Sequence, residues 1–332
     1  MTKRTPLNRR DFLRKLGLAG AGLALSGCAG EPVQQPLPTP FSESNSPTPV
    51  PGGTSEPTPS PSYGDIYMSV VHGEEPEEMV RRALAAIGGI ERFISSGDDV
   101  IIKPNICTDY YSYEYAATTN PFVVGTLVQL CRGAGANRVR VMDNPFGGTS
   151  QNAYRRSGIE ETVTAAGGEM EVMNSNKFRA NPIPDGVDIK EWVFYQDILD
   201  ADAFINVPIA KHHGTTGLTL GCKNLMGTIL NRGQIHANIH QRIADLASRV
   251  RPTLTVVDGV RTLMANGPTG GNLDDVKMSN TVIASADIVA ADSQAATLFG
   301  KTGADIGYIS AAAAMGLGVM DLSSVKVEEF SL

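Results

Sequence analysis

Beyond residue 66, short apolar runs alternate with segments whose apolar residues recur at helical spacing. In Pro76–Ile87, for example, Met79, Ala83 and Ile87 would lie on one face of a helix. The predicted strands are Tyr67–Val71, Asp99–Lys103, Arg138–Met142, Glu169–Met173, Ala203–Val207, Thr253–Asp258, Asn280–Ala284 and, as an edge strand, Val325–Phe330. The predicted helices are Pro76–Ile87, Pro121–Arg132, Gln151–Ser157, Ile159–Ala166, Asp287–Phe299 and Ile306–Met315. This alternation predicts an α/β fold with a mostly parallel sheet and helices on both faces.

The first 28 residues follow another pattern. The arginine pair Arg9-Arg10 precedes an apolar run, Leu16–Leu25, which is shorter than the roughly 20 residues that a membrane span needs. Such a run is typical of a signal peptide. The whole segment resembles a twin-arginine (Tat) export signal that ends in a bacterial lipobox at Cys28. This resemblance implies transport by the Tat translocase, lipidation of Cys28 and attachment to the outer side of a bacterial membrane.

Residues 29–62 are rich in Pro, Ser, Thr and Gly and contain few large apolar side chains. Such a composition cannot bury enough surface to offset the entropy of ordering, so it predicts a disordered linker. A semi-rigid spacer and a glycosylated stalk both fit this composition. We therefore expect three parts, namely the signal (1–28), the linker (29–62) and one α/β domain (63–332).

The charge of the chain limits its ligands. The formal net charge is −7, and the first 28 residues hold six of the 28 basic residues but one of the 35 acidic residues. The remaining chain is therefore more acidic than this total, which argues against binding of nucleic acid. A small anionic ligand would need a local basic pocket.

Cysteine is sparse, with Cys107, Cys131 and Cys222 beyond the lipobox. An odd number leaves at least one thiol without a partner inside the chain, and which two could pair stays open. No C-x-x-C motif is present, which argues against a zinc ribbon or a conventional iron–sulfur cluster.

Several predicted strands run into polar or glycine-rich loops. In a parallel sheet these loops lie at one edge, where ligands of α/β proteins bind. The residues expected to converge there as ligand-binding groups are Lys103, Asn105, Asp143, Lys211, Asn224, Gly270 and Asp292.

The segment from Lys211 to Gly227 is the richest in chemistry. Lys223 lies among apolar residues and Cys222, and burial there would lower its pKa toward the range of a base or of a Schiff-base lysine. We predict Lys223, His213 and Asp258 as catalytic residues, in which His213 or Lys223 moves a proton and Asp258 or Asp292 opposes it. His236 and His240 lie four residues apart, a spacing that can hold a metal on a helix but is also common on exposed faces.

Several motifs resemble domain-of-unknown-function family 362. They are Val100-Ile101-Ile102-Lys103-Pro104-Asn105, Lys211-His212-His213, Lys223-Asn224-Leu225-Met226-Gly227, Asp258-Gly259, Asn266-Gly267-Pro268-Thr269-Gly270-Gly271 and Ala286-Asp287-Ile288-Val289-Ala290-Ala291-Asp292. The resemblance covers roughly 65–330 and implies an α/β fold without implying a known reaction. Some members carry ferredoxin-type cysteine clusters, which this chain lacks, so it inherits no role in electron transfer.

The chain is also distantly similar to lactate racemase, whose site uses a histidine, a lysine ten residues later that anchors a nickel-pincer nucleotide, and a further histidine. Here His213 and Lys223 are ten residues apart, and His236 and His240 follow at other offsets. The similarity suggests a metal or a nucleotide-derived cofactor as one hypothesis.

The sequence is therefore compatible with three classes of function. The first is a membrane-tethered enzyme that acts on a small anionic substrate through a Lys/His/Asn/Asp pocket. The second is a tethered ligand-binding lipoprotein without turnover. The third is a cofactor- or metal-dependent redox or racemase-like enzyme.

Overall fold

The computed structural model describes residues 67–332. The export signal predicted from Arg9 and Arg10, the lipidation site predicted at Cys28 and the linker 29–62 lie outside the described residues. None of the helices in 67–332 has the length and apolar character that a bilayer span requires.

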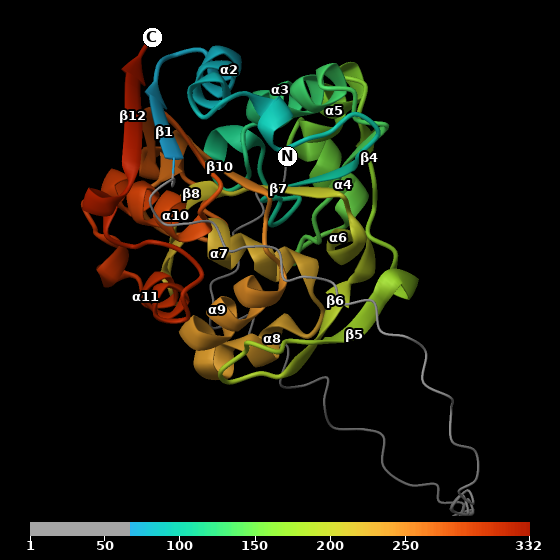
Figure 1. Ribbon diagram of the computed structural model, residues 1–332, viewed down its shortest axis with the longest axis vertical. Coiled ribbons are helices and arrows are strands. Elements are labelled where there is room, and N and C mark those ends of the chain that lie inside the picture. Colours follow the sequence, from blue (N-terminus) through green and yellow to red (C-terminus); the bar gives the residue numbers. More distant parts are fainter. Residues whose placement is uncertain (1–66) are drawn as a thin grey trace, which may run out of the picture. The chain divides into compact units, whose positions relative to one another are not determined.

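The domain is built on one mixed sheet of ten strands (Figure 1). Its strands are β1 (Tyr67–His72), β2 (Asp99–Pro104), β3 (Arg138–Val141), β4 (Glu169–Met170), β7 (Ala203–Val207), β8 (Ile209–His213), β9 (Gly217–Thr219), β10 (Leu254–Leu263), β11 (Val276–Ser285) and β12 (Lys326–Ser331). The main path runs β12-β1-β11-β10-β7-β2-β3-β4, while β8 pairs with β10 and β9. A separate hairpin joins β5 (Phe178–Pro182) to β6 (Glu191–Tyr195).

Most neighbouring strands of the sheet are parallel. The antiparallel pairs are β1 with β11, β10 with β11, and β8 with β9. The strand β2 shows why the centre is parallel, since Val100, Ile101 and Ile102 are all fully buried and a parallel strand is covered on both faces. The predicted α/β class, the mostly parallel sheet and the edge position of the last strand are confirmed.

Helices cover both faces of the sheet (Figure 1). The helices are α2 (Pro76–Ala86), α3 (Pro121–Gly133), α4 (Ser150–Arg156), α5 (Ile159–Ala165), α6 (Gln196–Asp200), α7 (Gly221–Asn224), α8 (Arg232–Ile235), α9 (Ile239–Arg249), α10 (Ile288–Ala296) and α11 (Gly307–Ala314). One apolar core lies under α2 to α5 and the other under α6, α7 and α9 to α11. Successive residues of a strand alternate between the two cores, as Ile101 does with its neighbours Val100 and Ile102.

Two features of the fold shape the pocket described below. The strand β10 does not end at Asp258, as predicted, but continues to Leu263 and pairs with β8, which lies off the main strand path of the same sheet. After β7, the chain passes through Pro208 directly into the β8–β9 hairpin. This hairpin therefore continues from the carboxyl end of β7, and its residues Lys211, His213 and Thr219 line the pocket.

The three cysteines of residues 67–332 are in the same chemical state. Cys107, Cys131 and Cys222 are buried free thiols, so no disulfide links them. Burial raises the pKa of the Cys131 thiol to about 12. The domain is accordingly stabilised by its two apolar cores rather than by cross-links.

Candidate functional site

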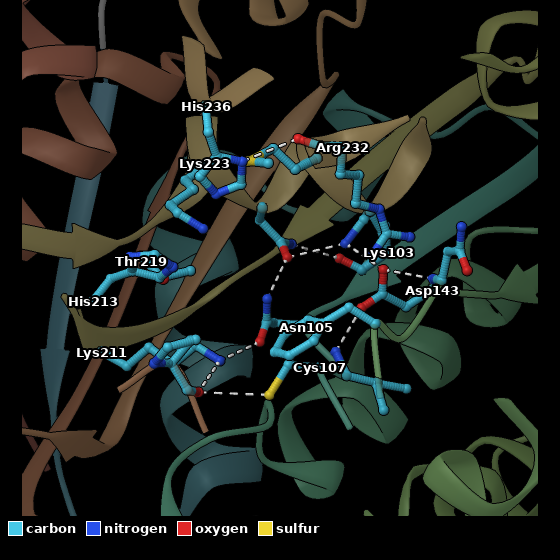
Figure 2. Close-up of a pocket in the computed structure, with 17 residues that line it drawn as sticks. Lys103, Asn105, Cys107, Asp143, Lys211, His213, Thr219, Lys223, Arg232 and His236 are labelled. Atoms are coloured by element: carbon cyan, nitrogen blue, oxygen red, sulfur yellow. Dashed lines mark hydrogen bonds and ion pairs between the residues drawn. The ribbon is translucent and has the colours of Figure 1, made fainter. Parts of the chain in front are cut away.

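A pocket of about 410 Å³ lies at the carboxyl ends of the central strands (Figure 2). Its wall comes from the ends of β2 and β3, the β8–β9 hairpin, and the segment from α7 to His236. The lining residues are Lys103, Asn105, Ile106, Cys107, Asp143, Asn144, Phe146, Lys211, His213, Thr219, Lys223, Asn224, Met226, Gly227, Arg232, His236 and Pro268. Four basic side chains thus face a single carboxylate, although the chain as a whole is acidic.

Lys103 is fixed on three sides at the base of the pocket. Its Nζ lies 2.8 Å from Asp143 Oδ1 and donates to Asn224 Oδ1 at 3.0 Å and to Pro104 O at 2.9 Å. Burial lowers the pKa of Lys103, and the neighbouring Asp143 opposes this effect. An ammonium has three hydrogens, so these contacts leave Lys103 no donor for a ligand.

Lys211 is also fully engaged, but only with neutral oxygens. Its Nζ donates to Asn105 Oδ1 at 2.8 Å, Ala117 O at 2.6 Å and Pro268 O at 3.0 Å. Within 67–332 it has no carboxylate partner. Lys211 therefore contributes an uncompensated positive charge to the pocket rather than a free hydrogen-bond donor.

Three asparagines connect these lysines. Asn105 Nδ2 donates to Asn224 Oδ1 at 2.9 Å, Asn224 Nδ2 donates to Asn206 Oδ1 at 2.8 Å, and Asn206 Nδ2 donates to Gly221 O at 3.1 Å. Because Asn224 Oδ1 accepts from both Lys103 and Asn105, the network fixes both lysines relative to α7. Such a network holds the pocket rigid before any ligand binds.

Lys223 differs from the other two lysines. Its Nζ makes no hydrogen bond and no ion pair with any residue of 67–332, although it is only partly exposed on the pocket wall. Burial lowers its pKa to about 7, and the positive charges of Lys211, Arg232 and Lys103 add to this effect. Near neutral pH, Lys223 is therefore a neutral amine in a large fraction of the molecules.

His213 faces the same space as a neutral ring. Its Nδ1 accepts from the backbone N–H of Thr215 at 3.1 Å and of Thr216 at 3.4 Å, so the hydrogen of the neutral ring lies on Nε2. Burial lowers the pKa of His213 to about 3, with Lys223 and Lys211 adding to the effect. His213 is thus a donor through Nε2–H and a poor base.

Three groups of the pocket were missed in the sequence. Arg232 lines it with a guanidinium whose only hydrogen bond within the described chain is Nε to Ile229 O at 3.4 Å. Burial lowers the pKa of Arg232, while Asp143 opposes this effect. Cys107 donates from Sγ to Ala117 O at 3.3 Å, and Thr219 is the third group. The turn Gly214-Thr215-Thr216-Gly217 between two short runs is a hairpin signal that would have placed Thr219 opposite Lys211.

The structure brings most of the predicted site residues into this pocket. Those that line it are Lys103, Asn105, Asp143, Lys211, His213, Lys223, Asn224 and His236. His236 lies at an exposed position, and its Nδ1 is 3.2 Å from Arg232 O. The pocket residues come from distant parts of the chain, as expected for loops that meet at one edge of a sheet.

Asp258, which we predicted as catalytic, lies elsewhere. Because β10 continues past it, Asp258 is buried in mid-strand, where it accepts from the backbone N–H of Asn120 at 2.7 Å and of Val260 at 3.0 Å. Burial raises its pKa to about 6. Its contacts fix the residue that caps α3, and it does not line the pocket.

Asp292 and Gly270 are also absent from the pocket wall. Asp292 lies on α10 and accepts from the backbone N–H of Gly221 at 2.5 Å and of Cys222 at 2.8 Å, and burial raises its pKa to about 7. It thereby holds the first turn of α7, which carries Lys223. Gly270 has a φ of +61° in the turn after Pro268, and its role is conformational.

The two histidines predicted as a metal pair have different surroundings. His236 is in the pocket wall, whereas the His240 ring stacks on Tyr308 with centroids 6.4 Å apart. Within 67–332, no group of three or more His, Cys, Asp or Glu side chains is arranged to hold a metal ion. The metal prediction therefore rests on two histidines alone and stays a prediction.

Comparisons with known proteins place the domain among relatives. The thylakoid-associated protein sll1697 of Synechocystis sp. is 25% identical over 222 residues, which cover 64% of this chain and 66% of that protein, just under two thirds of its length. The lactate racemase apoprotein from Thermoanaerobacterium thermosaccharolyticum is 15% identical over 72% of this chain and 59% of its own, with a TM-score of 0.45. A protein from Thermotoga maritima is 11% identical over 69% of this chain and 60% of its own, with a TM-score of 0.42. Neither structural likeness bears on activity.

A family model matches residues 100–297, a range that includes every residue of the pocket wall. The match covers more than half of the chain and agrees with the family resemblance found in the sequence motifs. This α/β domain therefore belongs to the family described as Domain of unknown function (DUF362).

Proposed function

We propose that this protein is an enzyme that binds a small anionic substrate and moves a proton to or from it. The observation that carries the proposal is Lys223, an amine with a pKa of about 7 and without a partner in 67–332, on the wall of a basic pocket. A volume of about 410 Å³ suits a small molecule. A base with a pKa near the working pH is the most effective proton carrier.

The free donors of the pocket suggest how the anion is held. Lys103 and Lys211 have all their hydrogens engaged, so they contribute positive charge. The terminal nitrogens of Arg232 make no hydrogen bond within the described chain, and a guanidinium fork matches the two oxygens of a carboxylate. Arg232 is therefore assigned as the anion-binding group.

The proton transfer is assigned to Lys223 and His213. In its neutral form, Lys223 takes a proton from a carbon next to a carbonyl or carboxylate group of the substrate, and the electron pair of the broken C–H bond moves onto an oxygen of that group. The Nε2–H of His213 donates to this oxygen and stabilises its negative charge, together with the field of the lysines. A neutral histidine paired with a separate base is a known arrangement for this chemistry.

Proton exchange in D₂O tests this proposal. The protein is incubated with a panel of small 2-oxo, 2-hydroxy and 2-amino acids. NMR follows the loss of hydrogen from the carbon next to the carboxylate in the hydroxy and amino acids, and from the carbon next to the keto group in the oxo acids. We expect exchange of at least one acid, at a rate that rises through pH 7 as Lys223 loses its proton. Lys223→Met is expected to abolish the exchange, whereas Lys301→Met, which removes an exposed lysine that does not line the pocket, is expected to retain it.

Two outcomes would count against parts of the proposal. If the protein binds a small acid but exchanges no proton in any of them, it acts as a ligand-binding protein rather than as an enzyme. If Lys223→Met exchanges as fast as the unaltered protein, the base is another group.

We also propose that the domain is exported in a folded state and tethered by a lipid on Cys28, with the linker 29–62 between them. The support is the order of Arg9-Arg10, the apolar run and the lipobox in the sequence. Cells labelled with a palmitate analogue should yield labelled protein in the membrane fraction. Cys28→Ser should remove the label, and replacing Arg9 and Arg10 by lysine should block export. Label that persists in Cys28→Ser would refute the lipidation site.

A further inference from the structure

Phe146 is an exposed apolar side chain at the mouth of the pocket. Ten large apolar side chains are exposed within 67–332, and among these Phe146 alone lines the pocket, with 57% of its surface exposed. Single exposed apolar residues are common on proteins, whereas apolar surface at the edge of a pocket marks a place where a ligand packs. The anion site described above gives Phe146 no role.

A second exposed aromatic ring lies beside Phe146. Tyr110 is 50% exposed, and a Cβ added to Gly147 would lie 2.7 Å from the Tyr110 hydroxyl oxygen. The Tyr110 ring is thus packed on the backbone of the residue after Phe146. Two loops hold these rings, because the backbone N–H of Phe146 donates to Cys107 O at 2.9 Å and Thr108 forms a parallel bridge with Gly147. The backbone therefore fixes this aromatic edge of the pocket.

The same two loops carry part of the anion site. Asp143 lies three residues before Phe146 and accepts from the backbone N–H of Ile106 at 2.6 Å. Asp143 is also paired with Lys103, and its charge opposes the lowering of the Arg232 pKa. Figure 2 shows Arg232, Lys103 and Asp143 on one side of the pocket. Three residues span at most about 11 Å, so the anion-binding guanidinium and Phe146 both lie near Asp143 and one ligand can contact both.

The polar side chains at the base of the pocket are saturated. Lys103 and Lys211 have no hydrogen left to donate, and Asn105 is bonded through both its oxygen and its amide nitrogen. A polar ligand group placed against them would lose its hydrogen bonds to water without replacement. The wall also includes the apolar side chains of Ile106 and Met226. This part of the pocket therefore favours an apolar ligand surface.

The volume of the pocket exceeds what an anionic group fills. Pockets of about 300–1,000 Å³ typically enclose drug-sized molecules, and this pocket has a volume of about 410 Å³. We infer that the substrate is a carboxylate with an apolar body of about the size of an aromatic ring, and that Phe146 selects it by packing against this body. This inference rests on the proposed function, because it assumes that Arg232 binds the anion.

Two acids that differ only in their apolar body test the inference. Phenylacetate is acetate with a phenyl group on its methyl carbon, so both acids carry one carboxylate and no other polar group. Their dissociation constants are measured by calorimetry or NMR titration with the unaltered protein, Phe146→Ala and Phe122→Ala. Phe122 is the matched control because it is also an exposed phenylalanine, at 40%, but lies on α3 and does not line the pocket.

The unaltered protein is expected to bind phenylacetate at least about tenfold more tightly than acetate, since a single methylene in an apolar pocket already contributes about that factor. Phe146→Ala is expected to reduce this ratio by a factor of about three or more, by weakening phenylacetate alone, because the contact between the two rings is lost. Phe122→Ala should leave the ratio unchanged, and Phe146→Leu, which keeps an apolar side chain, should retain most of the preference.

A second measurement needs no substitution and so does not depend on the folding of a variant. In the unaltered protein, a nuclear Overhauser effect is expected between the phenyl hydrogens of bound phenylacetate and the ring of Phe146. Its absence while phenylacetate is bound would refute the contact.

The outcomes separate this inference from the proposed function. Equal affinity for the two acids, or binding of a small polar acid of the exchange panel without binding of phenylacetate, refutes the apolar body and leaves the anion site standing. An unchanged ratio in folded Phe146→Ala refutes the role of Phe146 in the same way. If sedimentation shows a dimer that Phe146→Ala dissociates, a second copy of the chain covers this side chain and the inference fails. If none of these carboxylates binds, both the anion site and the inference fail.

Discussion

The ammonium of Lys103 lies 2.8 Å from the carboxylate of Asp143, and both side chains are buried, with 1% and 4% exposed. Asp143 also accepts from the backbone N–H of Ile106 at 2.6 Å and of Asn144 at 2.8 Å. The pair therefore joins the end of β2 to the end of β3 at the base of the pocket. An ion pair in this position is expensive to break, because either partner alone would be an uncompensated buried charge.

Lys103→Met and Asp143→Asn are each expected to lower the free energy of unfolding by about 3–5 kcal/mol. The double variant should lose clearly less than the sum, since it leaves no charge of the pair behind. Urea denaturation followed by circular dichroism measures all three values. Strictly additive losses would mean that the two side chains act independently, and the pair would then have no structural role.

Gly227 is the residue against which this pair packs. A Cβ at Gly227 would lie 2.5 Å from Lys103 Cε and 2.6 Å from its Nζ, both closer than real Cβ contacts. We expect Gly227→Ala to displace the pair, to destabilise the domain by about 1–3 kcal/mol and to abolish binding of small carboxylates. The affinity for phenylacetate and the unfolding curve measure both effects.

Gly233→Ala is the matched control for Gly227→Ala. A Cβ at Gly233 would meet nothing within 4 Å, and the residue lies in the helix α8. The substitution should leave binding unchanged and keep or slightly raise stability, because alanine is the better helix former. If both variants lose binding equally, the close contact at Gly227 is not the cause.

The fold and the convergence of several pocket residues can be predicted from local sequence signals. The run Val100-Ile101-Ile102 predicts a strand covered on both faces, and the rule that loops at the carboxyl ends of parallel strands converge predicts that Lys103, Asp143 and Lys211 meet. These inferences succeed because each depends only on a strand and on the residue directly after it.

The predicted site residues that do not line the pocket were misplaced because the sequence does not show where a strand ends or which strands pair with it. Asp258 looks like the end of a strand because Gly259 follows it, but pairing with β11 and β8 carries β10 five residues further and buries the carboxylate in the sheet. Asp292 lies on a helix, and the backbone N–H groups that donate to it belong to Gly221 and Cys222 at the start of α7. These residues are 71 and 70 positions away in the sequence. Arg232 reaches the pocket only through the packing of short elements, so no periodic pattern identifies it, whereas Thr219 is placed only by the hairpin turn that precedes it.

Asp292 is expected to support Lys223 from outside the pocket. Asp292→Ala would leave the backbone N–H groups of Gly221 and Cys222 without their acceptor, at a cost of about 1–3 kcal/mol for each buried group. We expect a lower melting temperature and, in the exchange assay, a reduced rate because the turn that carries Lys223 is loosened. Asp274→Ala, at an exposed position, serves as the control and should change neither value. A normal exchange rate in Asp292→Ala would show that Lys223 needs no such support.

The lowered pKa of Lys223 predicts that this lysine destabilises the folded domain, although the proposed function requires it. The pKa falls from 10.5 in the unfolded chain to about 7 in the folded domain, so the unfolded state binds more protons between these values and stability rises with pH across them. Below pH 7 the folded domain bears the full cost of a partly buried charge, on the order of a few kcal/mol because one pKa unit corresponds to about 1.4 kcal/mol. Lys223→Met removes this charge and should stabilise the domain near pH 6, with the gain shrinking toward zero at pH 10.5. Lys301→Met, which removes an exposed lysine outside the pocket wall, is the control. Urea denaturation at pH 6, 8 and 10 measures the gain in the free energy of unfolding of each variant. A gain for Lys223→Met that does not change with pH would contradict the lowered pKa.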